Sequence, residues 1–311
     1  MCTLAIVVPC FNEEEVLPSS LKQLVGTRIR LVDEGLISPD STLTFVDDGS
    51  TDGTWRLIEQ MSAIDPCVHG IKLTRNRGHQ NALLAGLLTV EGDAVVSIDA
   101  DLQDDVATIR DMVVRFRAGA QIVYGIRGDR GSDSAFKRGS AEGYYRLLRV
   151  LGVDVIFNHA DYRLMGRSAI DALRQFPEAN IFLRGIVPML GFPSDKVYYR
   201  RRERQAGESK YVLGRMLSLS WDGVTSFTTR PLRWITVGGF VVSAFSFGIG
   251  CWAVGVRFFL DAAVPGWAST VVPMYFLGGV QLISLGVLGE YVAKLYIEAK
   301  RRPRYLVEKT V

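Results

Sequence analysis

Short apolar runs alternate with helix-length amphipathic segments over residues 4–124. The runs that predict strands are 4–8, 42–46, 68–73, 94–98 and 121–124. Helical patterns start near residues 13 and 52 and cover 79–90 and 104–118. Strand, helix and strand at this spacing predict βαβ units, and hence an α/β fold with a mostly parallel sheet. In such a sheet, ligands bind beyond the carboxyl ends of the strands.

Two long apolar runs follow in the last quarter of the chain. Residues 235–256 contain no charged side chain, and residues 271–293 contain only Glu290. Each run is long enough to cross a bilayer core, which takes about 20 residues of helix. A core helix of a soluble domain seldom stays apolar on every face over this length. We therefore expect two transmembrane helices within residues 231–298.

Basic residues flank both runs. They are Arg230 and Arg233 before the first run, and Lys294, Lys300, Arg301, Arg302 and Arg304 after the second. The connecting loop carries only Arg257 and Asp261 as charged residues. By the positive-inside rule both outer flanks face the cytoplasm. The expected layout is a cytoplasmic domain at 1–208, the membrane region at 231–298 and a cytoplasmic basic tail at 299–311.

Residues 209–230 form a separate segment between the domain and the first apolar run. Apolar side chains recur there at helical spacing, in SKYVLGRMLSLSWDGVTSFTT. One interpretation is a juxtamembrane amphipathic helix in the membrane interface. The other is a helix packed on the soluble domain, because both settings need one apolar face.

Composition and charge exclude several classes of protein. The 311 residues carry a formal net charge of only +3, and the basic residues concentrate beside the apolar runs, which favours anionic lipid over nucleic acid as a partner. The four cysteines lack zinc-type spacing, which predicts free thiols. The amino terminus has no basic region before its short apolar stretch and is not typical of a signal peptide. Neither GxGxxG nor a P-loop motif is present.

The stretch DADLQDD at 99–105 follows a predicted buried strand and holds four carboxylates. Asp99, Asp101 and Gln103 alternate, so in an extended segment they share one side. Oxygen ligands of this kind suit Mg²⁺ or Mn²⁺, and magnesium is typically held by one or two carboxylates together with substrate phosphates. Asp104 and Asp105 are interpreted as the start of the next helix, where negative charge is favourable. The stretch therefore predicts a binding site for a metal–diphosphate.

Two more polar clusters follow strands, PCFNEEE at 9–15 and DDGSTDGT at 47–54. Tight turns and helix caps explain most of both clusters. They leave open why two aspartates end the second strand. Asp48 is a candidate acceptor for a base or ribose hydroxyl, while Phe11 and Glu13 are candidates to lie against a base and to accept from its edge.

Together these three motifs resemble those of the family 2 inverting glycosyltransferases, which have the GT-A fold. Four further stretches are similar to the polyprenyl-phosphate glycosyltransferases: DYRLMGRSAIDAL (161–173), FLRG (182–185), RQAGESKY (204–211) and GEYVAKLYIEAKRRPRY (289–305). That branch includes the bactoprenol glucosyltransferases, the dolichyl-phosphate mannose synthases and the aminoarabinose transferase. The two-span carboxyl terminus is most similar to the bactoprenol glucosyltransferases. The resemblance implies a Rossmann-like, mostly parallel GT-A domain carried by two transmembrane helices.

The resemblance also implies roles for individual residues. It implies that the nucleoside is bound by Pro9, Phe11, Glu13 and Asp48. It implies that the sugar diphosphate and its Mg²⁺ or Mn²⁺ are bound by Asp99, Asp101 and Gln103. Arg127 is implied near the donor sugar and phosphates, and Arg204 and Lys210 at a donor or acceptor phosphate. Asp161 takes the place of the acidic residue on the acceptor side. The loop Arg75, Asn76 and Arg77 matches the family pattern without an assigned role.

The implied reaction is inverting transfer of a hexose to polyprenyl phosphate at the cytoplasmic face of the inner membrane. UDP-glucose is the first choice of donor, and the alternatives are GDP-mannose or a modified UDP-sugar. Asp161 is usually called the base, but an acceptor phosphate with a second pKa near 6 is already mostly ionised at about pH 7. Our interpretation is that Asp161 orients Arg163 or another acceptor-binding cation. The alternative is that Asp161 caps a helix or has another purely structural role.

Other classes of protein also fit part of the sequence. A processive polysaccharide synthase needs a QxxRW motif, and RPLRW at 230–234 lacks the glutamine. A non-catalytic nucleotide-sugar-binding subunit does not need an intact DxD. Glycine pairs such as Gly238-Gly239 and Gly278-Gly279 offer close packing between copies of the chain, or between the two spans of one copy.

Overall fold

The computed structural model describes all residues except 102, 129–158, 179–180, 200–227 and 261–266. The described chain divides into two compact units. The first contains the described residues up to 199 together with Arg301–Val311, and the second contains the described residues 228–300. The predicted juxtamembrane helix at 209–230, and the predicted phosphate contacts Arg204 and Lys210, lie almost wholly outside the described residues.

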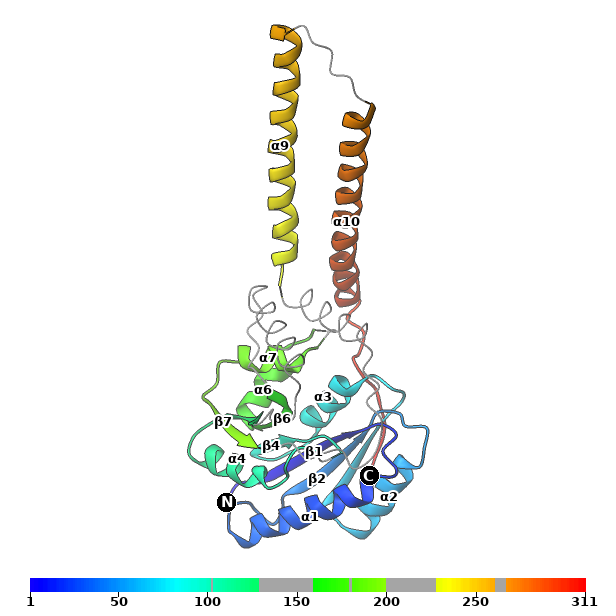
Figure 1. The fold of residues 1–311 in the computed structure, drawn as a ribbon. Helices are drawn as coiled ribbons and strands as arrows, with labels where there is room; N and C mark the ends of the chain where they lie inside the picture. The colour runs from blue at the N-terminus through cyan, green and yellow to red at the C-terminus, as the bar shows by residue number, and fades with distance from the viewer. Residues whose placement is uncertain (102, 129–158, 179–180, 200–227, 261–266) are drawn as a thin grey trace. The chain divides into compact units, whose positions relative to one another are not determined.

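An eight-stranded sheet forms the first unit (Figure 1). Its strands are β1 (Leu4–Cys10), β2 (Thr42–Asp47), β3 (Val68–Leu73), β4 (Ala94–Ser97), β5 (Ile122–Arg127), β6 (His159–Gly166), β7 (Ser194–Tyr199) and β8 (Val307–Thr310). Their order across the sheet is β7-β5-β6-β4-β1-β2-β3-β8. Strands β4, β1, β2 and β3 run parallel, whereas β6 is antiparallel to both its neighbours and β8 is antiparallel to β3. The sheet is therefore mostly parallel, as predicted.

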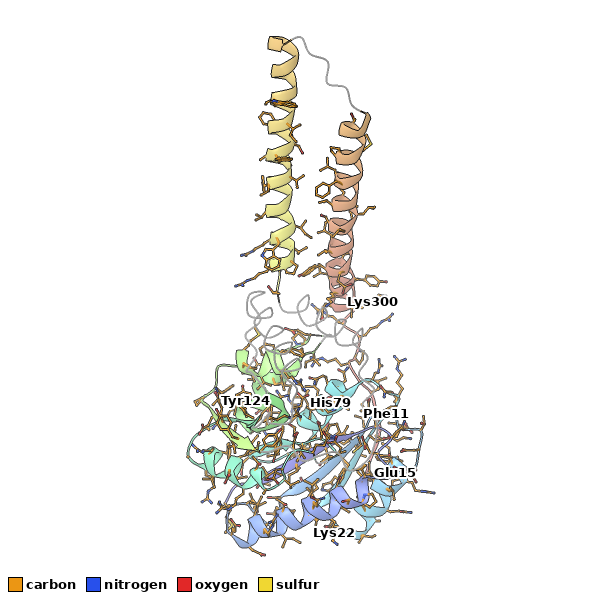
Figure 2. The ribbon with its side chains drawn as sticks, viewed as in Figure 1. Phe11, Glu15, Lys22, His79, Tyr124 and Lys300 are labelled. Carbon is orange, nitrogen blue, oxygen red and sulfur yellow. The ribbon has the colours of Figure 1, made fainter. Side chains whose placement is uncertain are left out.

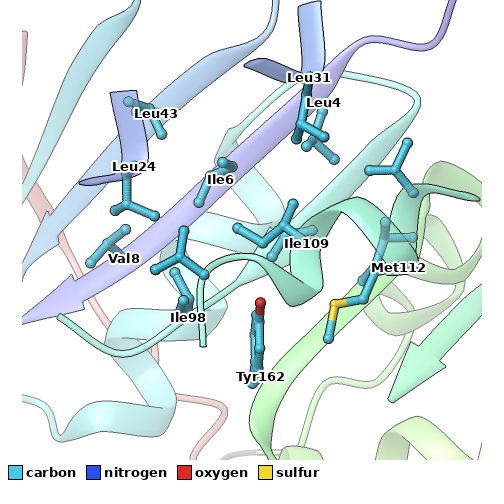
Figure 3. Close-up of a cluster of buried hydrophobic side chains, with 14 of the residues drawn as sticks. Leu4, Ile6, Val8, Leu24, Leu31, Leu43, Ile98, Ile109, Met112 and Tyr162 are labelled. Carbon is cyan, nitrogen blue, oxygen red and sulfur yellow. The ribbon is translucent and has the colours of Figure 1, made fainter. Parts of the chain in front are cut away.

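Helices cover both faces of this sheet (Figure 1). They are α1 (Leu17–Asp33), α2 (Thr54–Ile64), α3 (His79–Thr89), α4 (Thr108–Arg117), α6 (Arg167–Arg174) and α7 (Leu183–Met189). Every residue of β1 is buried, because a central parallel strand packs against helices on both sides. Leu4, Ile6 and Val8 share a core with Leu24 and Leu31 of α1 (Figure 3).

The opposite face of β1 packs directly against α3. A Cβ added at Gly86 would lie 2.3 Å from a methyl carbon of Val7 and 2.9 Å from one of Val46. Only glycine permits this approach of helix to sheet. The close contact holds the amino end of α3, and with it His79 and Gln80, at the carboxyl edge of the sheet.

The carboxyl-terminal residues differ from the prediction. We expected 299–311 to be a basic tail, but Val307–Thr310 is strand β8, which pairs with β3 at the sheet edge. Backbone bonds between Gly70 and Val311, at 2.9 and 3.0 Å, close the pairing. Exposed ion pairs also join β8 to the unit, such as Lys72–Glu308 at 3.0 Å. Four residues are too short a run for a period-two pattern to stand out beside the preceding arginines.

The second unit contains two long helices, α9 (Arg230–Leu260) and α10 (Trp267–Ala299). Within them, Arg230–Ile249 and Phe276–Ala299 are long and apolar enough to cross a membrane. Large apolar side chains such as Phe240, Phe245 and Leu282 are 70–74% exposed, unlike those of a soluble core. These helices agree with the two apolar runs of the sequence.

Candidate active site

Strand order brings the predicted polar clusters to one edge of the sheet. The carboxyl ends of β2, β1 and β4 are neighbours, and β6 runs antiparallel beside β4. Ser97 of β4 is paired with Arg163 of β6, so Asp161, two residues earlier, lies beyond the end of β4 and near Asp99. The edge thus presents, in order, the clusters after β2 and β1, the DADLQDD turn, and Asp161.

The loops after β1 and β2 are joined to each other by hydrogen bonds. The Asn12 amide donates to Ser50 Oγ at 3.0 Å, and Asn12 Oδ1 accepts from the Thr51 amide at 2.9 Å. The Gly53 amide donates to the Glu14 carboxylate at 2.8 Å. Asn12 adopts a left-handed conformation with φ 55°, which asparagine tolerates better than most residues. The two loops therefore form one preorganised unit.

Three predicted nucleoside contacts lie at the end of β1 or in the loop after it, in different settings. Phe11 is 43% exposed and lies at the surface (Figure 2). Pro9 is buried within β1, paired with Val46. Glu13 is half-buried, and its backbone amide donates to Thr54 Oγ1 at 2.9 Å. Of the three, Phe11 offers the most accessible surface for stacking on a base.

Asp48 holds a neighbouring loop in place. Its carboxylate is 2% exposed and accepts from the backbone amides of Arg77 at 2.7 Å and Gly78 at 2.8 Å. Burial raises the pKa of Asp48, although these two N–H donors lower it. The loop also packs tightly on Gly49, where an added Cβ would lie 2.6 Å from the Arg75 backbone. The sequence indicated a ligand contact for Asp48 and missed this loop-organising role.

The DADLQDD segment turns at Ala100 and Asp101 instead of continuing extended. The Gln103 amide donates to Asp101 Oδ1 at 3.2 Å, and Gln103 itself is 6% exposed. The simple alternation that predicted one shared side for Asp99, Asp101 and Gln103 therefore does not apply. Partial burial raises the pKa of Asp99 to about 6, and the carboxylates of Asp161, Asp104 and Asp101 add to the shift while His79 opposes it.

The charge around Asp99 bears on the predicted cation. Crowded oxygen anions are the donors that Mg²⁺ and Mn²⁺ prefer. Among the described residues, no group of three or more His, Cys, Asp or Glu side chains is arranged to hold a metal ion. Asp99 and Asp101 supply carboxylate oxygens of this kind at the turn after β4.

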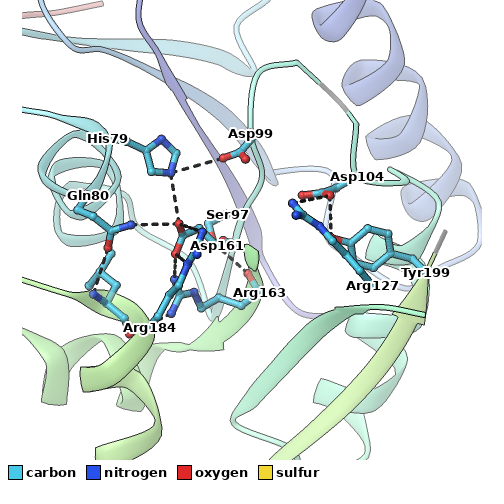
Figure 4. Close-up of polar contacts among 11 residues, drawn as sticks. His79, Gln80, Ser97, Asp99, Asp104, Arg127, Asp161, Arg163, Arg184 and Tyr199 are labelled. Carbon is cyan, nitrogen blue, oxygen red and sulfur yellow. Dashed lines mark hydrogen bonds and ion pairs between the residues drawn. The ribbon is translucent and has the colours of Figure 1, made fainter. Parts of the chain in front are cut away.

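Asp104 departs from its predicted place at a helix start. Helix α4 begins only at Thr108. The buried Asp104 carboxylate accepts from the Tyr199 hydroxyl at 2.7 Å and pairs with Arg127 Nη2 at 3.4 Å (Figure 4). Asp105 fits the prediction better, because its Oδ1 accepts from the Ala107 amide at 3.3 Å in the turn that leads into α4. Asp104 thus fixes Arg127, a predicted donor contact, beside the turn.

Asp161 is the centre of a buried charge network (Figure 4). It is 4% exposed and accepts from Arg163 Nη2 at 2.5 Å, Arg184 Nη2 at 3.0 Å and Gln80 Nε2 at 3.0 Å. His79 Nε2 lies 3.6 Å from the same carboxylate and 3.5 Å from Asp99. Burial alone would raise the pKa of Asp161, but His79, Arg184 and Arg163 hold it well below its usual range. Asp161 is therefore ionised and a weak base.

The sequence missed several members of this network. Arg184 was visible only as part of the FLRG stretch, and His79 and Gln80 only as the first residues of a predicted helix. Tyr199 gave no signal. Each becomes recognisable when the strand order and the start of α3 are known, because their partners are 23 to 95 residues away in sequence.

Comparison with known proteins agrees with this arrangement. Residues 5–174 match the family model for glycosyl transferase family 2. The chain belongs to this family of enzymes. The fold is shared with a solved mannosyltransferase from Pyrobaculum calidifontis, in complex with GDP-Man and Mn²⁺, at a TM-score of 0.50 and 16% identity over 96% of this chain and 86% of that one.

Several curated relatives match almost the whole chain. An uncharacterized glycosyltransferase of Bacillus subtilis (strain 168), YkoT, is 48% identical over 98% of this chain and 91% of its own length. The prophage bactoprenol glucosyl transferase homolog of Escherichia coli (strain K12) is 39% identical over 98% of both chains. The bactoprenol glucosyl transferase of Shigella phage SfII is 40% identical over 99% of this chain and 98% of its own.

Proposed function

We propose that the protein transfers glucose from UDP-glucose to a polyprenyl phosphate of the bactoprenol (undecaprenyl) class, with inversion at the anomeric carbon. The observation that carries the proposal is the adjacency of two features at one sheet edge. Asp99 and Asp101 suit a cation-bound diphosphate, and the cation-rich surroundings of Asp161 suit an anionic acceptor. The relatives named bactoprenol glucosyl transferase, similar over nearly their full length, support the choice of donor and acceptor.

The reaction is a single displacement. An oxygen of the acceptor phosphate donates its electron pair to the anomeric carbon, the bond from that carbon to the diphosphate breaks, and nucleoside diphosphate leaves with the bonding pair. Asp99, Asp101 and Gln103 are the residues that would hold Mg²⁺ or Mn²⁺, and the bound cation would supply charge neutralisation for the leaving diphosphate. The joined loops carrying Phe11 and Glu13, together with Asp48, bind the nucleoside. Arg127, fixed by Asp104, lies at the donor sugar and phosphates, and Arg204 and Lys210 are proposed contacts to donor or acceptor phosphate.

Asp161 orients cations in this scheme and does not remove a proton. The acceptor phosphate has a second pKa near 6 and is mostly ionised at about pH 7, so it needs little deprotonation. Arg163 and Arg184 already hold the Asp161 carboxylate. A pH–rate profile of Asp161→Asn checks this assignment. We expect reduced activity with the acidic limb retained, whereas loss of that limb with otherwise intact activity would support a base.

We further propose a multi-pass protein of the inner membrane with its catalytic unit in the cytoplasm. Strand β8 follows α10 in the chain and pairs with β3. Residues before α9 and after α10 must therefore lie on the same side of any membrane that the two helices cross. The basic residues on those flanks favour the cytoplasmic side.

A donor panel tests the proposed function. The purified full-length protein in detergent is supplied with Mn²⁺, undecaprenyl phosphate and one of UDP-glucose, UDP-galactose, UDP-N-acetylglucosamine or GDP-mannose, and the lipid product is analysed by mass spectrometry. We expect a hexose adduct from UDP-glucose. A product formed only from GDP-mannose would assign a polyprenyl-phosphate mannose synthase. No glycolipid from any donor would leave a non-catalytic nucleotide-sugar-binding subunit as the better description.

A further inference from the structure

Two arginines contact Asp161 in very different environments. Arg163, on β6, is fully buried, and its Nη1 also donates to the Leu183 carbonyl at 3.2 Å. Arg184, on α7, donates to Asp161 through Nη2 at 3.0 Å and Nε at 3.4 Å, and 41% of its side chain is exposed. Arg163 therefore reaches the Asp161 carboxylate from the protein interior, whereas Arg184 reaches it from the side that solvent contacts.

The position of Arg184 is fixed by a second connection. Gln80 donates through Nε2 to Asp161 at 3.0 Å and accepts at Oε1 from the Leu183 amide at 3.1 Å. Gln80 therefore ties the first residue of α7 to the same carboxylate that Arg184 contacts. His79, the neighbour of Gln80, is 43% exposed and lies between Asp161 and Asp99. The His79 imidazole thus lies between the Asp99 turn and Asp161, and the Arg184 guanidinium contacts Asp161 from α7 (Figure 4).

Strand order gives the direction from which a second substrate arrives. In the proposed function the nucleoside lies at the ends of β2 and β1 and the diphosphate at the end of β4. An inverting displacement needs its nucleophile opposite the leaving diphosphate. The next strand in that direction is β6, which carries Asp161, and Arg184 contacts Asp161 from α7.

We propose that Arg184 binds the phosphate of the acceptor, with the His79 imidazole beside it as a second donor, and that Asp161 and Gln80 are positioning residues for both. The proposal rests on the proposed function and names the acceptor subsite of that same site. A guanidinium has five N–H donors in a planar fork that matches phosphate oxygens, and its charge does not depend on pH in the working range. Asp161 engages one edge of that fork.

Steady-state kinetics on the full-length protein test the subsite. The variants are Arg184→Gln, Arg184→Lys and His79→Gln. The control is Arg110→Gln, which removes an exposed arginine of α4 that pairs with Glu34. We expect Arg184→Gln to raise the KM for undecaprenyl phosphate about 10- to 100-fold, the effect of losing a charged hydrogen bond, with the KM for UDP-glucose within about 2-fold. The KM of Arg184→Lys for undecaprenyl phosphate should lie between those of wild type and Arg184→Gln, because lysine keeps the charge and loses the planar fork of donors.

Binding of UDP by calorimetry shows whether each variant still folds. A raised KM for UDP-glucose with an unchanged KM for undecaprenyl phosphate would overturn the proposal, and so would unchanged values for both substrates. If Arg184→Gln fails to bind UDP, the Arg184→Lys result decides, since this variant preserves the ion pair with Asp161. A wild-type protein that forms no glycolipid from any donor contradicts the proposed function itself, an outcome distinct from these.

Discussion

The two ends of the site hold their carboxylates by different means. At the end of β2, Asp48 is bound by two backbone amides of a neighbouring loop. At the β6 end, Asp161 is bound by side chains from β6, α3 and α7. Backbone donors are neutral and belong to the fold, whereas Arg163 and Arg184 bring charges into a place where an unpaired charge is costly. The first arrangement suits a rigid cradle, and the second suits capture of an anion.

The largest effect on stability is expected at the β6 end. Asp161→Asn leaves the fully buried Arg163 without its carboxylate. Loss of one partner of a buried ion pair costs about 3–5 kcal/mol in free energy of unfolding. For a domain of this size that loss corresponds to a fall of roughly 10 °C in the midpoint of the catalytic unit's thermal transition. Differential scanning calorimetry of the purified protein measures it, and a fall under about 2 °C would contradict the ion-pair account.

The same variant has a defined pH dependence. Because the folded pKa of Asp161 is held below its usual value, its contribution to stability is present above the unfolded pKa of about 3.9 and is lost as pH falls through the folded value. The stability difference between wild type and Asp161→Asn should therefore be present at about pH 5 and shrink as the pH falls below about 4. Urea unfolding between about pH 5 and pH 2 checks the sign. A difference that grew as the pH fell below about 4 would exclude an ionised Asp161.

Between the two ends, the DADLQDD turn should matter for rate more than for stability. Asp101→Asn removes a proposed cation ligand that is only partly buried. We expect kcat to fall about 10²- to 10³-fold, the range seen when one group that stabilises transition-state charge is removed. The thermal midpoint should change little. Chelation by EDTA should abolish wild-type turnover, and Mn²⁺ or Mg²⁺ should restore it.

Asp111→Asn is the matched control for that variant. Asp111 lies on α4, is 61% exposed and pairs only loosely with Arg110 at 3.8 Å. It should keep wild-type kcat and wild-type metal dependence. Equal losses in Asp101→Asn and Asp111→Asn would show that any change of charge near α4 suffices, and would remove the case for a cation at Asp101.

At the β2 end the expected loss is smaller. Asp48→Asn keeps one acceptor oxygen but turns an NH₂ group toward the other backbone amide, so one charged hydrogen bond is lost. The cost in free energy of unfolding is about 1.5–3 kcal/mol. Because the loop at Arg77 and Gly78 loosens, the KM for UDP-glucose should rise while the KM for undecaprenyl phosphate stays the same. The opposite pattern in the two KM values would place Asp48 on the acceptor side.

The same contrast explains how much the sequence could predict. The five strands predicted at 4–8, 42–46, 68–73, 94–98 and 121–124 all occur, because buried parallel strands are continuous apolar runs. Helix starts were less accurate. Helix α1 begins at Leu17 and not near Glu13, because residues 12–14 bond to the loop after β2.

The β6 end was harder to predict because its contacts join residues that are far apart in the sequence. Strand β6 buries Asp161 and Arg163, and charged residues ordinarily argue against a buried strand. Their burial becomes intelligible only with the partners that α3 and α7 supply. Strands β7 and β8 pair with β5 and β3, which are distant in sequence, so short partly exposed runs gave little periodic signal. Asp161 was predicted as a site residue from the resemblance to a family, because the hydrophobic pattern alone does not single it out.

The smallest expected effect lies at Tyr199, which supports Arg127 through Asp104. Tyr199→Phe removes one hydroxyl bond of 2.7 Å to a buried carboxylate and keeps the edge-on contact with the Tyr162 ring at 5.3 Å. We expect about 1.5–3 kcal/mol at most in free energy of unfolding, reduced because Arg127 still pairs with Asp104. A rise of a few-fold in the KM for UDP-glucose should accompany it, because Arg127 Nε also donates to the Tyr199 hydroxyl at 3.3 Å and would lose this bond. Tyr198→Phe, at an exposed neighbouring position, is the matched control and should change neither quantity. If Tyr199→Phe raised only the KM for undecaprenyl phosphate, Arg127 would belong with Arg184 on the acceptor side. The acceptor side of the site would then include the turn after β4 as well as β6.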